Sequence, residues 1–225
     1  MSVLRAGAAL LAVLALAGCG GDDEETTTAA APPPPTQSQS ATGCRDVEQP
    51  QPRAPGTLKA PTALLNVDKT YLLTFETSCG DFTVRLDPKA SPKASASFLA
   101  LARGDYFDGT YFHRIVPGFV IQGGDPTGTG SGGPGYSTVD TPAAGTTYKR
   151  GVVAMAKTSA EAPGTAGSQF FVVTAPDAGL PADYAIVGRV VDGLDVVARI
   201  GVLGDPNTEL PTQPVVIDDV AVQAK

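Results

Sequence analysis

The larger, C-terminal part of the chain is divided into short apolar segments rich in β-branched and aromatic residues, separated by glycine, proline and small polar residues. Such segments are typical of β-strands, in which successive side chains point to opposite faces of a sheet. The separating residues are those that favour turns. The pattern predicts strands at Tyr71–Thr77, Asp81–Leu86, Tyr111–Val116, Phe119–Gln122, Gly151–Ala156, Gln169–Thr174, Ala185–Val190 and Pro214–Val222.

Two stretches have apolar residues at helical spacing instead. The first begins at Pro92, a residue favoured in the first turn of a helix, and ends at Gly104. The second begins near Gly193 and ends at Gly201 or Gly204. Many strands with two short helices indicate an all-β fold, a barrel whose ends are covered by helices.

The first residues, Met1–Ala17, have the pattern of a secretory signal. Arg5 supplies a positive charge, and the apolar run Ala8–Ala17 is too short to span a bilayer. The run ends in Leu-Ala-Gly-Cys19, which resembles the bacterial lipoprotein signal, whose cysteine carries lipid and becomes the first residue. This resemblance predicts a signal peptide over residues 1–18 and an extracytoplasmic protein anchored to the cell membrane through Cys19. An ordinary signal peptide with an incidental cysteine is the alternative.

An acidic run and four consecutive prolines follow, at Asp22–Glu25 and Pro32–Pro35. Residues 19–61 contain few large apolar side chains, so little burial is available to offset the entropy lost on ordering. We expect a disordered Thr/Pro-rich tether over residues 19–61 that leads to a folded domain over residues 62–225.

The formal net charge of −7 argues against a nucleic-acid partner, because phosphates attract a basic surface. A single histidine and the absence of a CxxC motif argue against a metal site. If Cys19 carries lipid, Cys44 and Cys79 remain, which is the number that one disulfide needs. A disulfide between them would join the end of the tether to a turn of the domain, and it fits an oxidising compartment.

One apolar stretch also carries charged and polar side chains, Phe112–Asp125 (FHRIVPGFVIQGGD). Strand alternation predicts that Phe112, Arg114 and Val116 share one face of its first strand. His113 is then expected to face away from Arg114. On this pattern alone, an arginine in such a strand is more often a surface residue than a donor aimed into a cleft.

The next segment, Gly124–Gly135, contains the spacing GxGxxG at Gly128, Gly130 and Gly133. A dinucleotide-binding site would require a helix to begin here, and Pro134 followed by glycine prevents that helix. We therefore expect a long glycine-rich loop rather than a nucleotide site.

The string FHRIVPGFVIQGGD resembles the signature of the cyclophilins, the prolyl cis-trans isomerases. A second block, GVVAMA at Gly151–Ala156 followed by GSQFF at Gly167–Phe171, resembles the other signature of that family. The resemblance covers about Leu65 to Gln223. It implies an eight-stranded antiparallel barrel with a helix over each mouth, and a monomer without a cofactor. It also implies peptidyl-prolyl isomerase activity on proline-containing polypeptide clients. A proline-peptide-binding module or holdase with little turnover is the alternative.

The resemblance also implies a role for each residue of the site. Arg114 would stabilise the twisted amide as the catalytic residue, and Gln122 would hold substrate backbone and fix the guanidinium. Apolar side chains would form a socket for the proline ring, although the pattern alone would place them in the core. The implied substrate-binding residues are Phe119, Val120, Gln122, Ala156, Gln169, Phe171, Leu180 and Tyr184.

The sequence departs from the family pattern at Lys157, Tyr184 and Val187, where asparagine, histidine and phenylalanine are usual. The chain also has no tryptophan, so the indole that contacts the drug cyclosporin in animal members is missing. These differences motivate the holdase alternative, but they leave Arg114 and the apolar socket in place.

Overall fold

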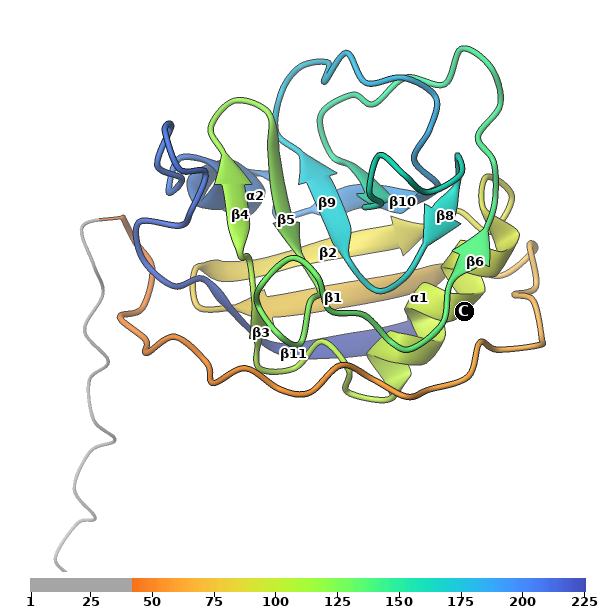
Figure 1. Cartoon of the computed structure of the whole chain (residues 1–225), viewed down its shortest axis with the longest axis horizontal. Coiled ribbons are helices and arrows are strands. Elements are labelled where there is room, and N and C mark those ends of the chain that lie inside the picture. Colours follow the sequence, from red (N-terminus) through yellow and green to blue (C-terminus); the bar gives the residue numbers. More distant parts are fainter. Residues whose placement is uncertain (1–41) are drawn as a thin grey trace, which may run out of the picture. The chain divides into compact units, whose positions relative to one another are not determined.

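The computed structural model describes residues 42–225. The predicted signal peptide, the predicted lipidation site Cys19 and residues 19–41 of the predicted tether lie outside the described residues. Residues 42–225 form eleven strands and two helices (Figure 1). The helices are α1 (Pro92–Arg103) and α2 (Leu194–Gly201). The strands are β1 (Tyr71–Thr77), β2 (Gly80–Leu86), β3 (Thr110–Tyr111), β4 (Arg114–Val116), β5 (Val120–Gly123), β6 (Thr138–Val139), β7 (Val152–Met155), β8 (Thr165–Ala166), β9 (Phe170–Val173), β10 (Ile186–Asp192) and β11 (Val216–Ala224).

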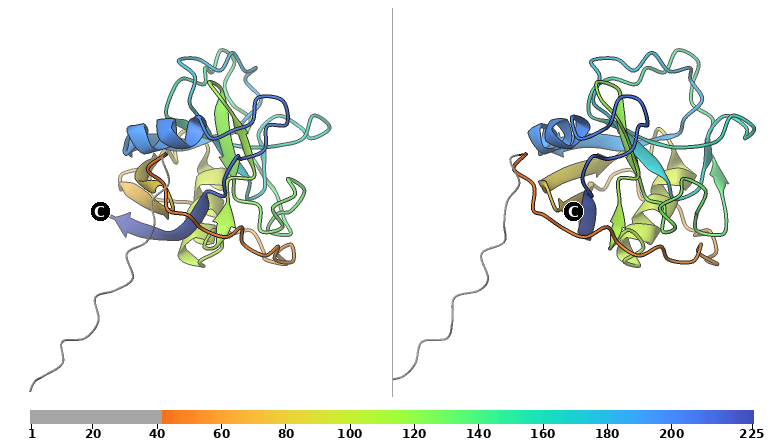
Figure 2. Two further views of the ribbon diagram at one scale, coloured as in Figure 1. Left: turned by 90° about the vertical axis from the view of Figure 1, so that its left-hand side faces the viewer. Right: turned by 60° about the vertical axis from the view of Figure 1, so that its left-hand side comes forward.

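Nine of the strands in this described region form one antiparallel sheet, in the order β3-β11-β1-β2-β10-β7-β9-β5-β4. The short strands β6 and β8 pair with each other. The sheet curls around a common interior, and the two helices lie on different sides of it (Figures 1 and 2). Helix α1 packs against β10 and β11, whereas α2 packs against β2 and β5. None of the helices within residues 42–225 is long and apolar enough to cross a membrane.

Phenylalanine rings from several elements fill the interior of the curled sheet. Phe75 of β1 lies 5.0 Å from Phe82 of β2 and 5.4 Å from Phe170 of β9, measured between ring centroids. Phe98 of α1 meets Phe170 edge-on at 5.2 Å. All four rings are fully buried. Helix α1 therefore closes one side of the interior by inserting the ring of Phe98. Its edge-on contact with Phe170 has a geometry that aromatic pairs favour.

Strand β9 is buried on both faces, and it separates two apolar regions. Phe170 and Val172 belong to the interior cluster, whereas Phe171 and Val173 belong to a smaller second cluster with Tyr148. Successive residues of a strand point to opposite faces, so the sequence Phe-Phe-Val-Val supplies both regions at once. The second cluster supports the candidate site described below.

The mainly β, antiparallel architecture with two helices is confirmed. The predicted hairpin is present as β1 and β2, and α1 begins at Pro92 and ends before Gly104, as predicted. The number of strands differs because the predicted strand Tyr111–Val116 is divided into β3 and β4, which pair with β11 and β5 respectively. The pair formed by β6 and β8 falls in segments where the sequence predicted no strand.

The division of that strand changes the position of one side chain. Phe112 lies between β3 and β4, and its ring packs in the interior cluster together with Ile115. The prediction that Phe112 shares a face with Arg114 is therefore wrong. Alternation holds only along an unbroken strand, and the strand is interrupted at residues 112–113, where its pairing partner changes from β11 to β5.

Residues 44–58, which we call the strap, run along the domain (orange in Figure 1). Cys44 is buried and forms a disulfide with Cys79, which lies in the turn between β1 and β2. Beside the disulfide, the backbone N–H of Arg45 donates to the carbonyl of Ser78 at 2.7 Å. The first end of the strap is therefore fixed to the β1–β2 hairpin.

The other end of the strap pairs with the glycine-rich loop. The backbone N–H of Gly56 donates to the carbonyl of Gly133, and that of Leu58 donates to the carbonyl of Pro134, each at 2.8 Å. Composition placed this segment in the disordered tether. The structure differs because a disulfide and backbone hydrogen bonds, rather than burial of large apolar side chains, hold the strap in place.

Candidate active site

Neighbouring strands bring a row of side chains together on one face of the sheet. Arg114 of β4 lies opposite Gln122 of β5, and Gln122 lies opposite Phe171 of β9. The row continues with Ala154 of β7 and Ile186 of β10. Directly opposed residues of antiparallel strands point to the same face, so a charged, a polar and an aromatic side chain lie next to one another.

A cavity of about 140 Å³ lies beside this row. Its lining includes every predicted catalytic and substrate-binding residue except Gln169. That residue lies in an adjoining cleft, whose lining also includes Gln122 and Ala156. Lys157, one of the departures from the family pattern, lines both spaces. The residues that line the cavity are Arg114, Phe119, Val120, Gln122, Ala156, Lys157, Phe171, Leu180 and Tyr184.

Two aromatic rings form one wall of the cavity. Tyr184 meets Phe171 edge-on, with ring centroids 5.4 Å apart and an angle of 85° between the planes. Tyr148 holds this wall: its hydroxyl donates to the carbonyl of Tyr184 at 2.8 Å and accepts from the N–H of the same residue at 2.9 Å. Burial raises the pKa of the Tyr148 phenol, which keeps the hydroxyl a donor. This support could not be predicted from the sequence, because Tyr148 lies in a segment without strand or helix periodicity.

The guanidinium of Arg114 is held from two sides. Its Nε donates to the carboxylate oxygen Oε2 of Glu209 at 2.6 Å, and its Nη1 lies 3.4 Å from the side-chain carbonyl of Gln122. The Arg114 side chain is 36% exposed, so it is neither a freely solvated surface group nor a buried one. Glu209 follows Arg114 by 95 positions and lies outside every motif of the sequence, so this contact was not predicted.

Two glutamines continue this polar chain into the glycine-rich loop. The side-chain amide of Gln122 donates to the side-chain carbonyl of Gln169 at 3.1 Å. The amide of Gln169 in turn donates to the carbonyls of Gly130 and Gly132, each at 2.9 Å. Each amide therefore has a defined orientation, as expected of glutamines set between apolar residues. The chain of contacts leads from the loop to Arg114.

The glycine-rich loop is itself wrapped around a carboxylate. Asp125 is buried, and it accepts hydrogen bonds from the backbone N–H groups of Thr127, Gly130 and Gly132. Burial acts to raise the pKa of Asp125, but these hydrogen bonds outweigh burial, and the pKa lies below its usual value. A Cβ atom on Gly132 would collide with the Asp125 carboxylate. The loop that contains the GxGxxG spacing thus forms a cradle for a side chain of the protein itself.

Comparisons with known proteins agree with this geometry. The family described as "Cyclophilin type peptidyl-prolyl cis-trans isomerase/CLD" matches residues 72–222. Peptidyl-prolyl cis-trans isomerase CYP18-2 of Arabidopsis thaliana is 42% identical over 149 residues, which cover 64% of this chain and 89% of that protein. Peptidyl-prolyl cis-trans isomerase B of Streptomyces anulatus is 39% identical, over 68% of this chain and 96% of that protein. The chain belongs to the cyclophilin family.

Solved cyclophilin structures have the same fold. The crystal structure of a Cryptosporidium parvum cyclophilin type peptidyl-prolyl cis-trans isomerase superposes with a TM-score of 0.63 at 34% identity. The alignment covers 68% of this chain and 98% of that one. The activity of the chain is accordingly that of a peptidyl-prolyl cis-trans isomerase.

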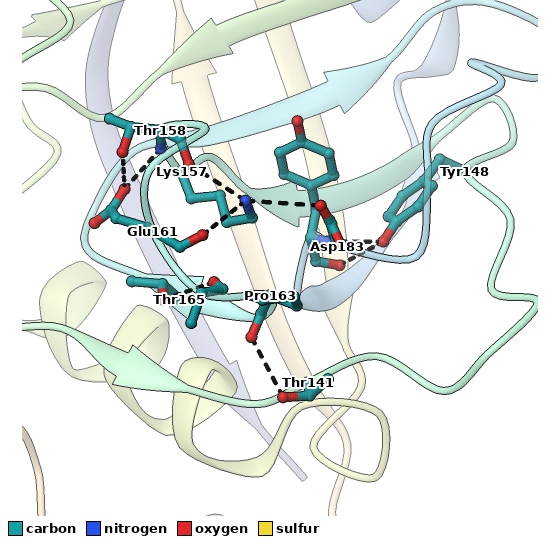
Figure 3. Close-up of polar contacts among 10 residues, drawn as sticks. Thr141, Tyr148, Lys157, Thr158, Glu161, Pro163, Thr165 and Asp183 are labelled. Carbon is teal, nitrogen blue, oxygen red and sulfur yellow. Dashed lines mark hydrogen bonds and ion pairs between the residues drawn. The ribbon is translucent and has the colours of Figure 1, made fainter.

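In this cyclophilin, Lys157 has an unusual environment (Figure 3). Its side chain is only 5% exposed, and its Nζ donates to the carbonyls of Thr158 and Glu161 at 3.3 and 3.2 Å. The ammonium also lies 3.8 Å from a carboxylate oxygen of Asp183 and 5.5 Å from the centre of the Tyr184 ring. Lys157 therefore joins the loop that follows β7 to the segment that carries Tyr184, so its charge is engaged within the protein.

His113 is buried on the side of the cyclophilin that faces the glycine-rich loop. Neither ring nitrogen has a hydrogen-bond partner within the described part of the chain. Burial lowers the pKa of His113, an effect larger than the opposing one of the nearby Asp125 carboxylate. A neutral, enclosed imidazole agrees with the structural role expected for it, and it does not line the cavity around Arg114.

Proposed function

We propose that this enzyme isomerises X-Pro peptide bonds in the cavity beside Arg114. We also propose that it works outside the cytoplasm, joined to the cell membrane by a lipid-anchored tether. The single observation that carries the first part is the position of the Arg114 guanidinium. It lines a cavity that also has apolar walls, and it is held from two sides by Glu209 and Gln122. The second part rests on the N-terminal sequence and on the disulfide.

The chemistry requires little from the protein. Rotation about a peptide bond faces a barrier of about 18–20 kcal/mol, because resonance gives the C–N bond partial double-bond character. Twisting the amide breaks this resonance and localises a lone pair on the nitrogen. No bond is broken and no proton is transferred, so the catalyst needs only to bind the twisted amide more tightly than the planar one. The required parts are an apolar socket, a fixed donor and a grip on the neighbouring backbone.

The apolar walls of the cavity supply the socket. Phe119, Val120, Phe171 and Leu180 enclose a space into which a prolyl ring can be transferred from water, and burial of the ring favours binding. The hydroxyl of Tyr148 holds the Tyr184 wall in place. This socket fixes one side of the X-Pro bond while the other side turns.

Arg114 supplies the fixed donor. A guanidinium carries five N–H groups, and two of them are engaged by Glu209 and Gln122. The others remain for the substrate, where they stabilise the charge distribution of the twisted amide. A donor that is already oriented does not have to reorganise as the bond turns, which is the condition for strong electrostatic catalysis. Gln122 and Gln169 also present polar atoms at the cleft for the backbone of a proline-containing polypeptide.

The extracytoplasmic setting is supported by three features of the chain. The lipoprotein-like signal ends at Cys19, an acidic Thr/Pro-rich segment follows it, and the remaining cysteines, Cys44 and Cys79, form a disulfide. Disulfides persist in oxidising compartments and are rare in the cytosol. In this arrangement the lipid on Cys19 holds the enzyme at the membrane, and residues 19–41 separate it from the surface.

The setting is tested by labelling cells that express the chain with radioactive fatty acid. The chain should incorporate label and fractionate with membranes, whereas Cys19→Ser should do neither. A wild-type chain that takes up no label contradicts the lipid anchor.

A second candidate function is a proline-peptide-binding module with little turnover, favoured by Lys157 and Tyr184 in the cavity wall. An isomerase assay with a prolyl reporter peptide separates the two. Wild type and Lys157→Asn should both accelerate isomerisation, because the Lys157 ammonium is engaged within the protein. Binding of the peptide without acceleration by the wild type would favour the module.

A further inference from the structure

The carboxylate that meets Arg114 comes from a loop between α2 and β11. Oε2 of Glu209 accepts from Nε of Arg114 at 2.6 Å. The side chains of the two residues are 43% and 36% exposed, so the pair lies at the rim of the cavity rather than in the core. An exposed ion pair of this kind contributes little to the stability of the fold.

The backbone of Glu209 is unusual. Its φ is +60°, in the left-handed region, and Asp105 is the only other residue of the described range besides glycines with such a value. This region is sparsely populated by residues with a side chain, and such residues occur preferentially at functional sites. A glycine would adopt the same conformation at lower cost. The chain therefore has a glutamate at a position where the backbone conformation alone would favour glycine.

The loop that carries Glu209 is firmly seated against β4. The N–H of Ile115, the residue after Arg114, donates to the carbonyl of Glu209 at 2.9 Å. The N–H of Glu209 donates to the carbonyl of Asp205 at 2.8 Å. A Cβ atom on Gly204 would collide with the carbonyl of Ile115, so the loop approaches the strand closely. The carboxylate is thus delivered to Arg114 from a backbone that is attached to the same strand.

We propose that Glu209 is a positioning residue for Arg114, an inference that rests on the proposed catalytic role of Arg114. Glu209 engages Nε, and Gln122 engages Nη1, so the guanidinium is gripped at two of its three nitrogens. This grip prevents the planar fork from turning about its own stem. The remaining N–H groups then stay directed at the cavity that Arg114 lines.

The proposal makes a specific kinetic claim. A donor that is free to rotate still binds substrate through the apolar socket, but it is misaligned when the amide is twisted. Loss of Glu209 should therefore lower kcat and leave KM nearly unchanged. A role of Glu209 in holding the fold together would instead appear in the melting temperature.

Three variants of the full mature chain test the claim, and Asp105→Gly serves as the matched control. Glu209→Gly removes the carboxylate, so kcat should fall about tenfold. It also places glycine where the backbone is left-handed, which removes a conformational cost, so the melting temperature should stay equal or rise. Asp105→Gly relieves the same backbone conformation away from the site, so it should raise the melting temperature without lowering kcat. Glu209→Gln keeps an acceptor for Nε and should retain kcat within about twofold of wild type.

The third variant, the double change Arg114→Ala with Glu209→Gly, shows whether Glu209 acts through Arg114. It should have the same residual kcat as Arg114→Ala alone, because Glu209 then has no guanidinium to orient. Wild-type kcat in Glu209→Gly overturns the proposal, and so does a Glu209→Gln enzyme as impaired as Glu209→Gly. A kcat of the double variant that is lower than that of Arg114→Ala alone also overturns the proposal. Full activity of Arg114→Ala would instead contradict the proposed function itself, and the two failures are therefore distinguishable.

Discussion

The side-chain amide of Gln122 donates to the side-chain carbonyl of Gln169 at 3.1 Å, and this contact joins the strand pair that carries Arg114 to the glycine-rich loop. Gln122 also holds Nη1 of Arg114, and Gln169 holds the carbonyls of Gly130 and Gly132. The cradle around Asp125 keeps that loop in place. The orientation of the donor at the cavity thus depends on residues that do not line the cavity.

Gln169→Glu is the sharpest test of this connection, because it preserves the shape of the side chain and removes its N–H donors. A carboxylate would face the carbonyls of Gly130 and Gly132, which repel it, so the link to the loop should be broken. We expect kcat/KM to fall about tenfold, with a smaller change in melting temperature. The measurement is prolyl isomerisation followed alongside a thermal melt. Wild-type kcat/KM in a folded Gln169→Glu enzyme would show that the connection has no catalytic importance.

The disulfide between Cys44 and Cys79 is expected to stabilise the domain. It closes a loop with a sequence separation of 35 residues, for which chain entropy in the unfolded state predicts about 4 kcal/mol. The double variant Cys44→Ala with Cys79→Ala should lose a free energy of unfolding of about this size in a denaturant titration. Reductant should shift the wild-type curve in the same direction and leave the variant curve where it is. Coincident curves for oxidised wild type and variant would contradict the expectation.

The stability of the domain should depend on pH through His113, the only histidine of the chain. Burial lowers its pKa in the folded state, so the unfolded chain binds its proton more readily than the folded one. The stabilising contribution is therefore fully present above the unfolded pKa of about 6.5, and it is lost as the pH falls below that value toward the folded pKa. Unfolding free energies of wild type should decline between pH 7 and pH 5.5, and His113→Asn should show a smaller decline. Parallel declines in the two proteins would assign the effect to other groups.

Two residues of the cavity wall should respond differently to truncation. Leu180 is partly exposed at the wall, so Leu180→Ala should raise KM for a prolyl peptide and leave the melting temperature nearly unchanged. Phe171 is 4% exposed and packs between Tyr148 and Tyr184, so Phe171→Ala should also destabilise the domain, by about 3–5 kcal/mol. Equal effects of the two substitutions on stability would be inconsistent with this account of the wall.

Much of the fold was predictable because local signals and tertiary structure agree. The turn at Cys79 with its two flanking strands, and the helix that begins at Pro92, need no distant partner to be recognised. The pairing of Arg114 with Gln122 also follows from a short hairpin. Phe112 was misplaced because a change of pairing partner interrupts the strand, and alternation cannot reveal such a break.

The features that were not predictable depend on contacts that are distant in the sequence. Glu209 lies in a polar loop, and nothing in its neighbourhood indicates that a left-handed backbone directs it to Arg114. The strap has the composition of a tail, and its order comes from the disulfide and from backbone pairing with residues 133–134. Backbone hydrogen bonds carry no side-chain signature, so composition alone places such a segment with disordered chain.

The catalytic role of Arg114 is the central claim, and the rate of prolyl isomerisation by Arg114→Ala tests it most directly. The substitution removes a partly exposed ion pair, so the protein should remain folded, which a thermal melt and circular dichroism can verify. Arg114→Lys should restore little activity, because an ammonium cannot reproduce a planar fork held at two points. We predict a loss of about 10²–10³ in kcat, or about 3–4 kcal/mol, with a smaller change in KM. A folded Arg114→Ala enzyme that isomerises a prolyl peptide at a rate near that of wild type would contradict the mechanism.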